Sequence, residues 1–293
     1  MDTDPTPPRL RLTLAYDGTP WRGWQTLSGG GAVQDALDAA LAKVADGPVR
    51  SQGSGRTDAG VHALGQVAHA IVPHPHRLPP EAWVRALNAH LPPTIRVLHA
   101  SLQHGFHARF DAIGKVYRYR IWRSDILHPL EVNRAWHVYG PLDADLLRRG
   151  ASLLEGRHDF SRLSANRAGS TALPATPDPL HAVRTLHRVT LHTDPAQPLW
   201  ELEFEGDGFL YKMVRMLVGS LVHIARGRAP LAWLEDLLQH PQDGIKSNQS
   251  APAAGLYLVR VLYADEPHPR SADPQPAGSK RAGPDASSPA QGV

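Results

Sequence analysis

The chain contains no cysteine among its 293 residues. Disulfide bonds, thiolate metal sites and cysteine-based catalysis are therefore excluded. Long apolar runs are also missing: the longest, residues 216–225, is interrupted by Gly219, Ser220 and His223 and is far too short to span a membrane. The N-terminal residues 1–5 are acidic and proline-rich, and no apolar core of a signal peptide follows them. These absences predict a cytoplasmic protein without a membrane segment.

The fingerprints of the common cofactors are missing as well. No G-x-G-x-x-G sequence follows an expected strand, and no phosphate-binding Walker loop is present. The 17 histidines are scattered and show no spacing typical of a metal site. We therefore expect neither a cofactor nor a bound metal.

The charge balance leaves a modest positive excess. The whole chain carries a formal net charge of +3. Residues 1–8 contribute −2 and residues 266–293 contribute zero, so residues 9–265 carry +5. This excess is compatible with a polyanionic partner such as a nucleic acid, but it does not identify one.

Two segments of similar pattern follow each other along the chain, and each reads β-α-β-β-α-β. In the first, leucines at positions 10, 12 and 14 alternate with other residues as in a half-buried strand, and apolar residues between 33 and 44 have the spacing of an amphipathic helix. The expected elements of the first half are a strand over 10–16, a helix over 33–44, strands over 49–52 and 66–71, a helix over 81–90 and a strand over 95–102. Those of the second half are a strand over 115–122, a helix over 143–155, strands over 183–192 and 199–205, helices over 209–226 and 230–240, and a strand over 256–263.

This duplicated pattern predicts an α+β fold of two antiparallel sheets side by side, with helices on one face and a groove on the other. We expect an N-terminal half at 9–108 and a C-terminal half at 109–265. Residues 164–180 lack periodicity and are expected to form a surface insertion. Residues 1–8 and 266–293 are expected to be disordered, because the proline-rich, polar tail cannot bury enough apolar surface to become ordered.

The most distinctive stretch is GRTDAGVHA, residues 55–63, which places two glycines, a cation, a hydroxyl and a carboxylate between two expected strands. Such a polar, glycine-hinged segment is typical of a loop, where functional residues often lie. From local composition alone, a solvated hairpin turn explains it equally well. Periodicity alone likewise makes Tyr117 a packing residue beside Tyr119, and Arg215 a solvated charge on a helix.

Several stretches together resemble the tRNA pseudouridine synthase A family. They are YDGT (16–19), GWQ (23–25), GRTDAGVHA (55–63), FHARF (106–110), KVYRY (115–119), Phe209, MVR (213–215), VGS (218–220) and GLYL (255–258). In this order they extend along nearly the whole chain. The chain departs from the family pattern in the length of the 164–180 insertion and at Leu163, where an aromatic residue is commoner.

The resemblance implies an enzyme that isomerises uridine to pseudouridine at positions 38–40 of the tRNA anticodon arm, as a homodimer and without a cofactor. It implies Asp58 as the nucleophile, with Arg215 as the cation beside it. Tyr117 is implied as the surface on which the detached uracil stacks. Arg56 is expected to hold a phosphate or to fill the space left by a flipped-out uridine. The groove between the halves is then expected to hold the RNA.

Two other functions stay open. A nucleosidase or glycoside hydrolase that uses Asp58 needs a second carboxylate, and the nearest in sequence, Asp46 and Glu81, lie outside the loop. A non-catalytic RNA-binding protein would have no use for the full set of four implied residues. His62 is expected to structure the loop rather than to act as an acid, a base or a metal ligand.

Overall fold

The computed structural model describes residues 8–74, 77–165, 182–243 and 245–264. Residues 1–7, the tail at 266–293 and all but the first two residues of the 164–180 insertion lie outside the described residues. The expectations for those segments therefore stay predictions. None of the helices in the described part of the chain has both the length and the apolar character that a membrane crossing needs.

Both halves contain the expected elements, with small additions in the second. The first half contains β1 (Arg9–Tyr16), α1 (Val33–Ala45), β2 (Ser51–Gly53), β3 (His62–Ala70), α2 (Pro80–His90) and β4 (Ile95–Gln103). The second contains β5 (Ala112–Trp122), β6 (Trp136–His137), α3 (Ala144–Leu154), β7 (Gly156–Asp159), β8 (Val183–Thr193), β9 (Leu199–Gly206), α4 (Met213–Ala225), α5 (Leu231–Gln239) and β10 (Leu256–Tyr263). Short 3-10 helices lie at Pro129–Glu131, Ser161–Leu163, Pro241–Asp243 and Ala253–Gly255.

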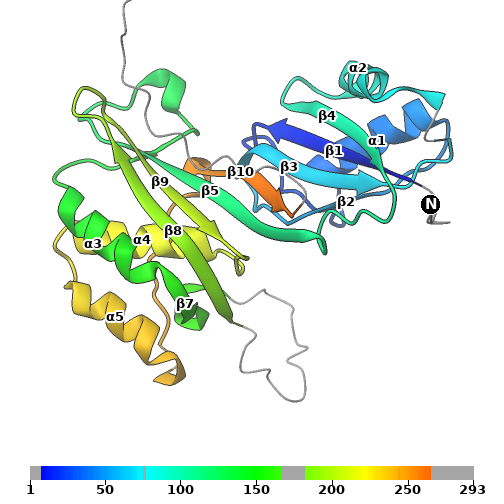
Figure 1. Cartoon of the computed structure of the whole chain (residues 1–293). Coiled ribbons are helices and arrows are strands. Elements are labelled where there is room, and N and C mark those ends of the chain that lie inside the picture. Colours follow the sequence, from blue (N-terminus) through cyan, green and yellow to red (C-terminus); the bar gives the residue numbers. More distant parts are fainter. Residues whose placement is uncertain (1–7, 75–76, 166–181, 244, 265–293) are drawn as a thin grey trace, which may run out of the picture.

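The strands of both halves form one continuous sheet (Figure 1). Its strand order is β4-β1-β3-β10-β5-β9-β8-β7, with β2 paired to β3 and β6 paired to β5. The last strand of the second half, β10, joins the halves: it runs antiparallel to β5 and parallel to β3, where Tyr257 lies opposite His62. The α+β class with two β-α-β-β-α-β halves is confirmed, and the two expected sheets are joined edge to edge.

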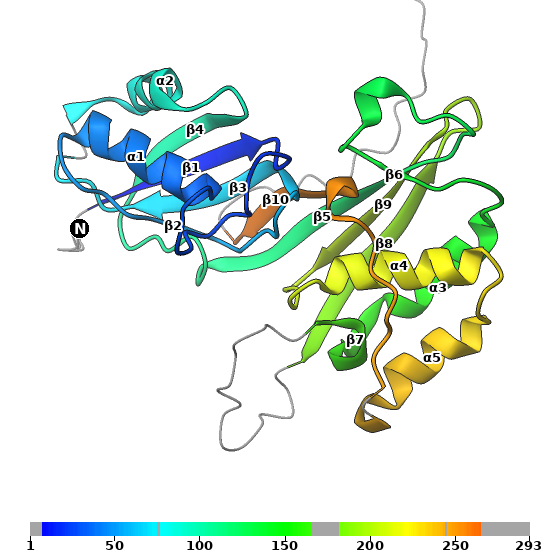
Figure 2. The same cartoon turned by 180° about the vertical axis from the view of Figure 1, so that it is seen from behind.

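The helices of both halves cover the same face of this sheet (Figure 2). In the first half, Leu10, Leu12 and Leu14 of β1 are fully buried together with Leu37 and Leu41 of α1. The apolar side chains on one face of β1 therefore pack in the same core as the apolar side chains on one face of α1. In the second half, α3 and α4 pack side by side, and the buried face of α4 consists largely of aliphatic residues.

The opposite face of the second half is covered by ion pairs between neighbouring strands. Arg118 of β5 lies 3.1 Å from Glu203 and 3.6 Å from Glu201 of β9. Arg188 of β8 lies 3.1 Å from Glu205. Because successive side chains on a strand point to opposite faces, the alternation of charged and apolar residues in β5 and β9 separates this charged face from the core.

Helix α4 begins later than the sequence pattern indicates. A helix was expected over 209–226, whereas α4 starts at Met213. The physical reason is Lys212, whose φ of 57° is left-handed and cannot continue a right-handed helix. Residues 209–212 are therefore freed from the helix and form part of a cavity wall.

His69 of β3 fixes the connection between β4 and β5. Its Nδ1 accepts a hydrogen bond from the Ala108 backbone N–H at 3.1 Å, and its Nε2 lies 3.5 Å from a guanidinium nitrogen of Arg9. A proton on Nδ1 would face an N–H donor, and the new charge would lie beside Arg9. Burial, with His107 and Arg9 nearby, lowers the pKa of His69 to about 4.

We therefore expect the unfolding free energy to fall as the pH drops from about 6.5, the ordinary histidine pKa, towards about 4, the pKa of His69 in the folded protein. In this window the unfolded chain binds more protons than the folded one, so acid favours unfolding. His69→Gln keeps an acceptor for Ala108 and should flatten part of this pH dependence in urea titrations. His187→Gln is the control at an exposed histidine. If the unfolding free energy of His69→Gln depends on pH in the same way as that of the wild type, His69 is not the source of the acid sensitivity.

Candidate active site

A cavity of about 490 Å³ lies where the two halves meet. Gln34 near the start of α1 and Met213 at the start of α4 both line it, so it opens between these helices. Because α1 and α4 lie on the helix-covered face of the sheet, the expected position of the groove on the uncovered face is wrong for this cavity. The cavity lies on this face because hydrogen bonds hold the loop at residues 54–61 there.

This loop is anchored to the helix-covered face by hydrogen bonds. The Tyr16 hydroxyl lies 2.8 Å from Thr57 Oγ1, and Tyr16 points to the same side of β1 as the core leucines. The Trp24 backbone N–H donates to the Thr57 carbonyl at 3.0 Å, and Gln66 Nε2 donates to the Gly55 carbonyl at 2.9 Å. These bonds hold both the hydroxyl and the carbonyl of Thr57, and the next residue, Asp58, lines the cavity.

Gly23 allows the close packing behind this loop. Its φ is 95°, and a Cβ atom there would lie 2.7 Å from the Thr57 carbonyl oxygen. Only glycine adopts this backbone conformation readily and leaves the space empty. The GWQ stretch thus supports the loop from behind, a role that no feature of its sequence alone indicates.

Asp58 is paired with Arg215 of α4. Arg215 Nη1 lies 3.5 Å from Asp58 Oδ2, and the two side chains are 17% and 22% exposed. Arg215 Nε also donates to the Ala251 carbonyl at 2.8 Å, and the Ala251 N–H donates to the Arg215 carbonyl at 2.9 Å. Arg215 is therefore a fixed, largely buried cation, and the interpretation from periodicity as a solvated charge is wrong.

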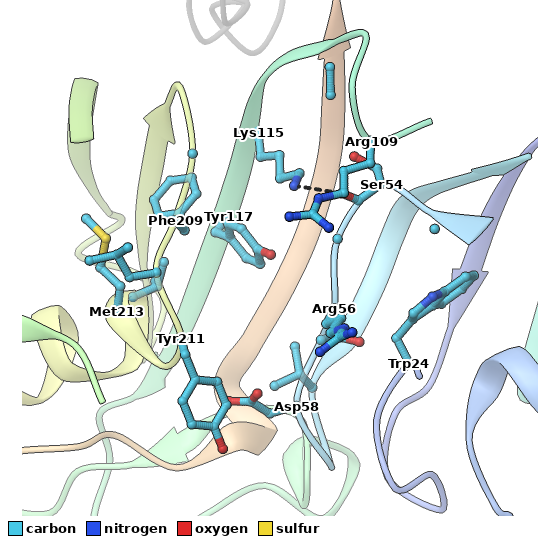
Figure 3. A pocket seen from close by; sticks show the side chains of 18 of the residues that line it. Trp24, Ser54, Arg56, Asp58, Arg109, Lys115, Tyr117, Phe209, Tyr211 and Met213 are labelled. Carbon is cyan, nitrogen blue, oxygen red and sulfur yellow. Dashed lines mark hydrogen bonds between the residues drawn. The ribbon is translucent and has the colours of Figure 1, made fainter. Parts of the chain in front are cut away.

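Tyr117 of β5 forms the apolar wall of the cavity beside Asp58 (Figure 3). It is only 8% exposed and meets Phe209 edge to face, with ring centroids 5.0 Å apart. Burial, with Tyr16 and Asp58 nearby, raises the pKa of Tyr117, so its phenol stays neutral at physiological pH. Tyr119, two residues along, is fully buried and donates to the Pro252 carbonyl at 2.8 Å, so it is the packing residue of the pair.

The fold thus brings together the residues that sequence reasoning singled out: Asp58, Tyr117 and the exposed Arg56 line the cavity, and Arg215 is paired with Asp58 without lining it. The sequence model of the tRNA pseudouridine synthase family matches residues 14–111 and 151–264 of this chain. The chain belongs to this family.

Individual relatives match over most of their length. The tRNA pseudouridine synthase A of Akkermansia muciniphila is 44% identical over 259 residues, which cover 88% of this chain and 96% of that protein. The protein of the same name from Bordetella petrii is 40% identical over 262 residues, covering 88% of this chain and 92% of the relative. A solved Cbf5-Nop10-Gar1 complex aligns at a TM-score of 0.37 and 11% identity over 85% of this chain; the match covers 48% of that chain, so this chain spans about half its length.

His62 lies at the start of β3 and clamps the two halves together behind the loop. Its Nε2 lies 2.8 Å and 3.1 Å from the carbonyl oxygens of Asn133 and Ala254, and its Nδ1 lies 3.1 Å from the Gly18 N–H. The Gly18 N–H at Nδ1 and the two carbonyl oxygens at Nε2 favour a neutral imidazole that donates from Nε2. Burial lowers the pKa of His62 and outweighs the opposing effect of Asp17, whose Oδ1 lies 3.3 Å from Nδ1. This arrangement agrees with the structuring role expected for His62.

Sequence reasoning missed four cations of the cavity, Arg109, Lys115, Arg184 and Lys212. Lys115 Nζ donates to the Ser54 carbonyl at 3.1 Å, and burial, with Arg109 nearby, lowers the pKa of Lys115 to about 8. A signal was available for Lys115: it stands two residues before Tyr117, so both side chains point to the same face of β5. Nothing in the local sequence indicates where Arg109 points.

One group of side chains with the geometry of metal ligands occurs among the described residues. It consists of Asp236, His240 and Asp243 at the end of α5. None of these residues lines the cavity. The Asp236 carboxylate is already paired with Arg162 and His240, each at 3.1 Å. This group is therefore separate from the candidate active site.

Proposed function

We propose that this protein is a tRNA pseudouridine synthase in which Asp58 attacks a flipped-out uridine. The N1–C1′ bond of the nucleotide breaks, the uracil turns, and a C5–C1′ bond forms. The C5 proton leaves and N1 gains a proton, so the product is an isomer of the substrate. This isomerisation needs no oxidant and no imported group, but it needs a nucleophile and a surface that retains the base.

The observation that carries the proposal is that Asp58 lines a cavity walled by Tyr117 and is paired there with the guanidinium of Arg215. A carboxylate attacks as an anion, and the guanidinium stabilises that charge where the cavity walls partly exclude water. Tyr117 is well placed to stack on the detached uracil, a contact worth about 1–3 kcal/mol per base. A nucleotide inside a stem reaches such a cavity only when it leaves the base stack.

Finer features of the function follow from the family resemblance. We expect the target uridines to be those at positions 38–40 of the anticodon arm, and the protein to work as a homodimer in the cytoplasm. Arg56, exposed at the cavity and two residues from Asp58, is expected to contact a phosphate or to occupy the place of the flipped nucleotide. The halves at 9–108 and 109–265 would each supply one side of the site.

A test of the proposed function uses an unmodified tRNA transcript. After incubation with the protein, pseudouridine is mapped by carbodiimide-dependent stops of reverse transcription, and the RNA mass is measured. We expect stops at positions 38–40 and an unchanged mass. Release of free uracil would instead indicate a nucleosidase, and binding without any product would indicate a non-catalytic RNA-binding protein.

The cavity itself weighs against the nucleosidase. Such enzymes ordinarily use two carboxylates that flank the bond to be cleaved. A second carboxylate, Asp207, lines the cavity, but both of its oxygens accept the Thr185 backbone N–H, at 3.0 and 3.1 Å. It is therefore engaged in holding β8 against the chain that follows β9.

A further inference from the structure

One wall of the cavity carries two cations for which the proposed mechanism has no use. Arg109 lies in the connection between β4 and β5, and Lys115 lies within β5. Figure 3 shows both side chains reaching towards the same space beside Ser54, above Tyr117 in that view. Lys115 lies on the same face of β5 as Tyr117, two residues away, which places their Cα atoms about 7 Å apart along the strand.

Neither cation is neutralised by a carboxylate within the described part of the chain. The Arg109 guanidinium lies 5.7 Å from the Phe110 ring centroid, and Lys115 Nζ has its one hydrogen bond to Ser54. Both carboxylates that line the cavity are engaged elsewhere, Asp58 with Arg215 and Asp207 with a backbone N–H. Lys115 is partly buried and Arg109 is exposed beside it, and two like charges this close cost free energy until an anion arrives.

We propose that Arg109 and Lys115 together bind one phosphodiester group of the RNA strand that carries the target uridine. An ammonium has three hydrogens, of which Ser54 takes one, and a guanidinium offers five N–H donors in a planar fork. The two non-bridging oxygens of a phosphodiester match this set of donors. This assignment rests on the proposed function for the identity of the anion, and it gives the site a second point of attachment beside the base platform.

The electrostatics of the free protein support this assignment. Burial and the neighbouring Arg109 lower the pKa of Lys115 to about 8, so Lys115 is mostly protonated at neutral pH but is easily deprotonated. A phosphodiester between the two cations would favour the charged form of Lys115 and raise its pKa again. The single hydrogen bond to Ser54 would at the same time fix the ammonium at the base of the catalytic loop.

The first test is the salt dependence of tRNA affinity. We expect Arg109→Gln to weaken binding and to reduce the slope of log affinity against log salt by about 0.7–0.9, the value for one lost phosphate contact. Arg109 is exposed, so the variant should fold. Arg109→Lys should keep the slope. The matched control is Arg188→Gln, the same charge change on the opposite face of the sheet, where Glu205 keeps a partner in Arg260 at 3.7 Å; its slope should equal that of the wild type.

The second test follows the pKa of Lys115 directly. The chain contains five lysines, so carbon-13 labelling of lysine gives few resonances, and the Lys115→Met variant assigns the one from Lys115. We expect this resonance to titrate near pH 8 in the free protein and at least about one unit higher in the tRNA complex. A pKa that does not move, or an Arg109→Gln slope equal to that of the wild type, would overturn the assignment.

The two tests separate this inference from the proposed function. Pseudouridine formation by the wild-type protein tests the function, whereas the salt slope and the titration measure binding alone. Loss of turnover in Arg109→Gln with an unchanged slope would mean that Arg109 acts on a later step, and the phosphate site would be wrong while the function stands. A reduced slope without any product from the wild-type protein would support the phosphate site on a non-catalytic RNA-binding protein.

Discussion

Asp58→Asn should reduce pseudouridine formation to background and leave tRNA affinity nearly unchanged. Asparagine keeps the shape of the side chain but loses the negative charge and most of the nucleophilicity. If Asp58 attacks the nucleotide, turnover should fall at least a thousandfold, which corresponds to about 4 kcal/mol in the barrier. Removal of one anion from a cationic cavity does not weaken phosphate contacts, so affinity should stay constant or rise.

The folded state should tolerate this substitution. The Asp58–Arg215 pair is long at 3.5 Å, and asparagine keeps a side-chain oxygen that can face the guanidinium, so the largely buried Arg215 is not left without a polar neighbour. Arg215 also keeps its hydrogen bond to the Ala251 carbonyl. The matched control is Asp207→Asn, the same change in the same cavity, which should retain most of the turnover. If Asp58→Asn keeps activity within tenfold of the wild type, Asp58 is not the nucleophile, and another carboxylate must take that role.

The periodicity of the sequence predicted most of the strands and helices but little of the geometry of the site. The strand at 256–263 coincides with β10, and β1, α2, β8 and β9 agree within one or two residues, because local periodicity reflects which side of an element is buried. The late start of α4 was missed because a left-handed lysine such as Lys212 leaves no trace in composition. The single residue that interrupts the helix also shapes the cavity.

The site depends on contacts that periodicity cannot reveal. Asp58 and Arg215 are separated by 157 positions in the chain and meet because β10 joins the two halves. Only the family resemblance paired them beforehand. The face of the groove was misplaced for a related reason: the sequence shows that β1 has a buried side, but not that Tyr16 on that side would hold Thr57 and draw the loop over it.

The contribution of Tyr117 can be separated from that of its burial by three substitutions. In Tyr117→Phe the ring stays, and the hydroxyl that is lost has no hydrogen-bond partner among the described residues. Most of the turnover should therefore remain. Tyr117→Leu keeps an apolar side chain beside Phe209 but cannot stack on a base, so turnover should fall strongly while the fold persists. Tyr117→Ala should lose turnover and also stability, by about 3 kcal/mol, the cost of emptying a buried aromatic position.

The comparison of Tyr117→Leu with Tyr117→Phe decides whether Tyr117 acts as a surface for base stacking. Loss of a base-stacking contact of about 1–3 kcal/mol corresponds to a fall of roughly 5- to 150-fold in turnover. Tyr119→Phe is the control on the same face of β5: it gives up the hydrogen bond to Pro252, so its melting temperature should drop slightly while turnover stays. Turnover is measured on an unmodified transcript well below the melting temperature of each variant. If Tyr117→Leu is as active as Tyr117→Phe, an aromatic surface at this position is not needed, and Phe209, which lies beside Tyr117, or Tyr211 becomes the base platform.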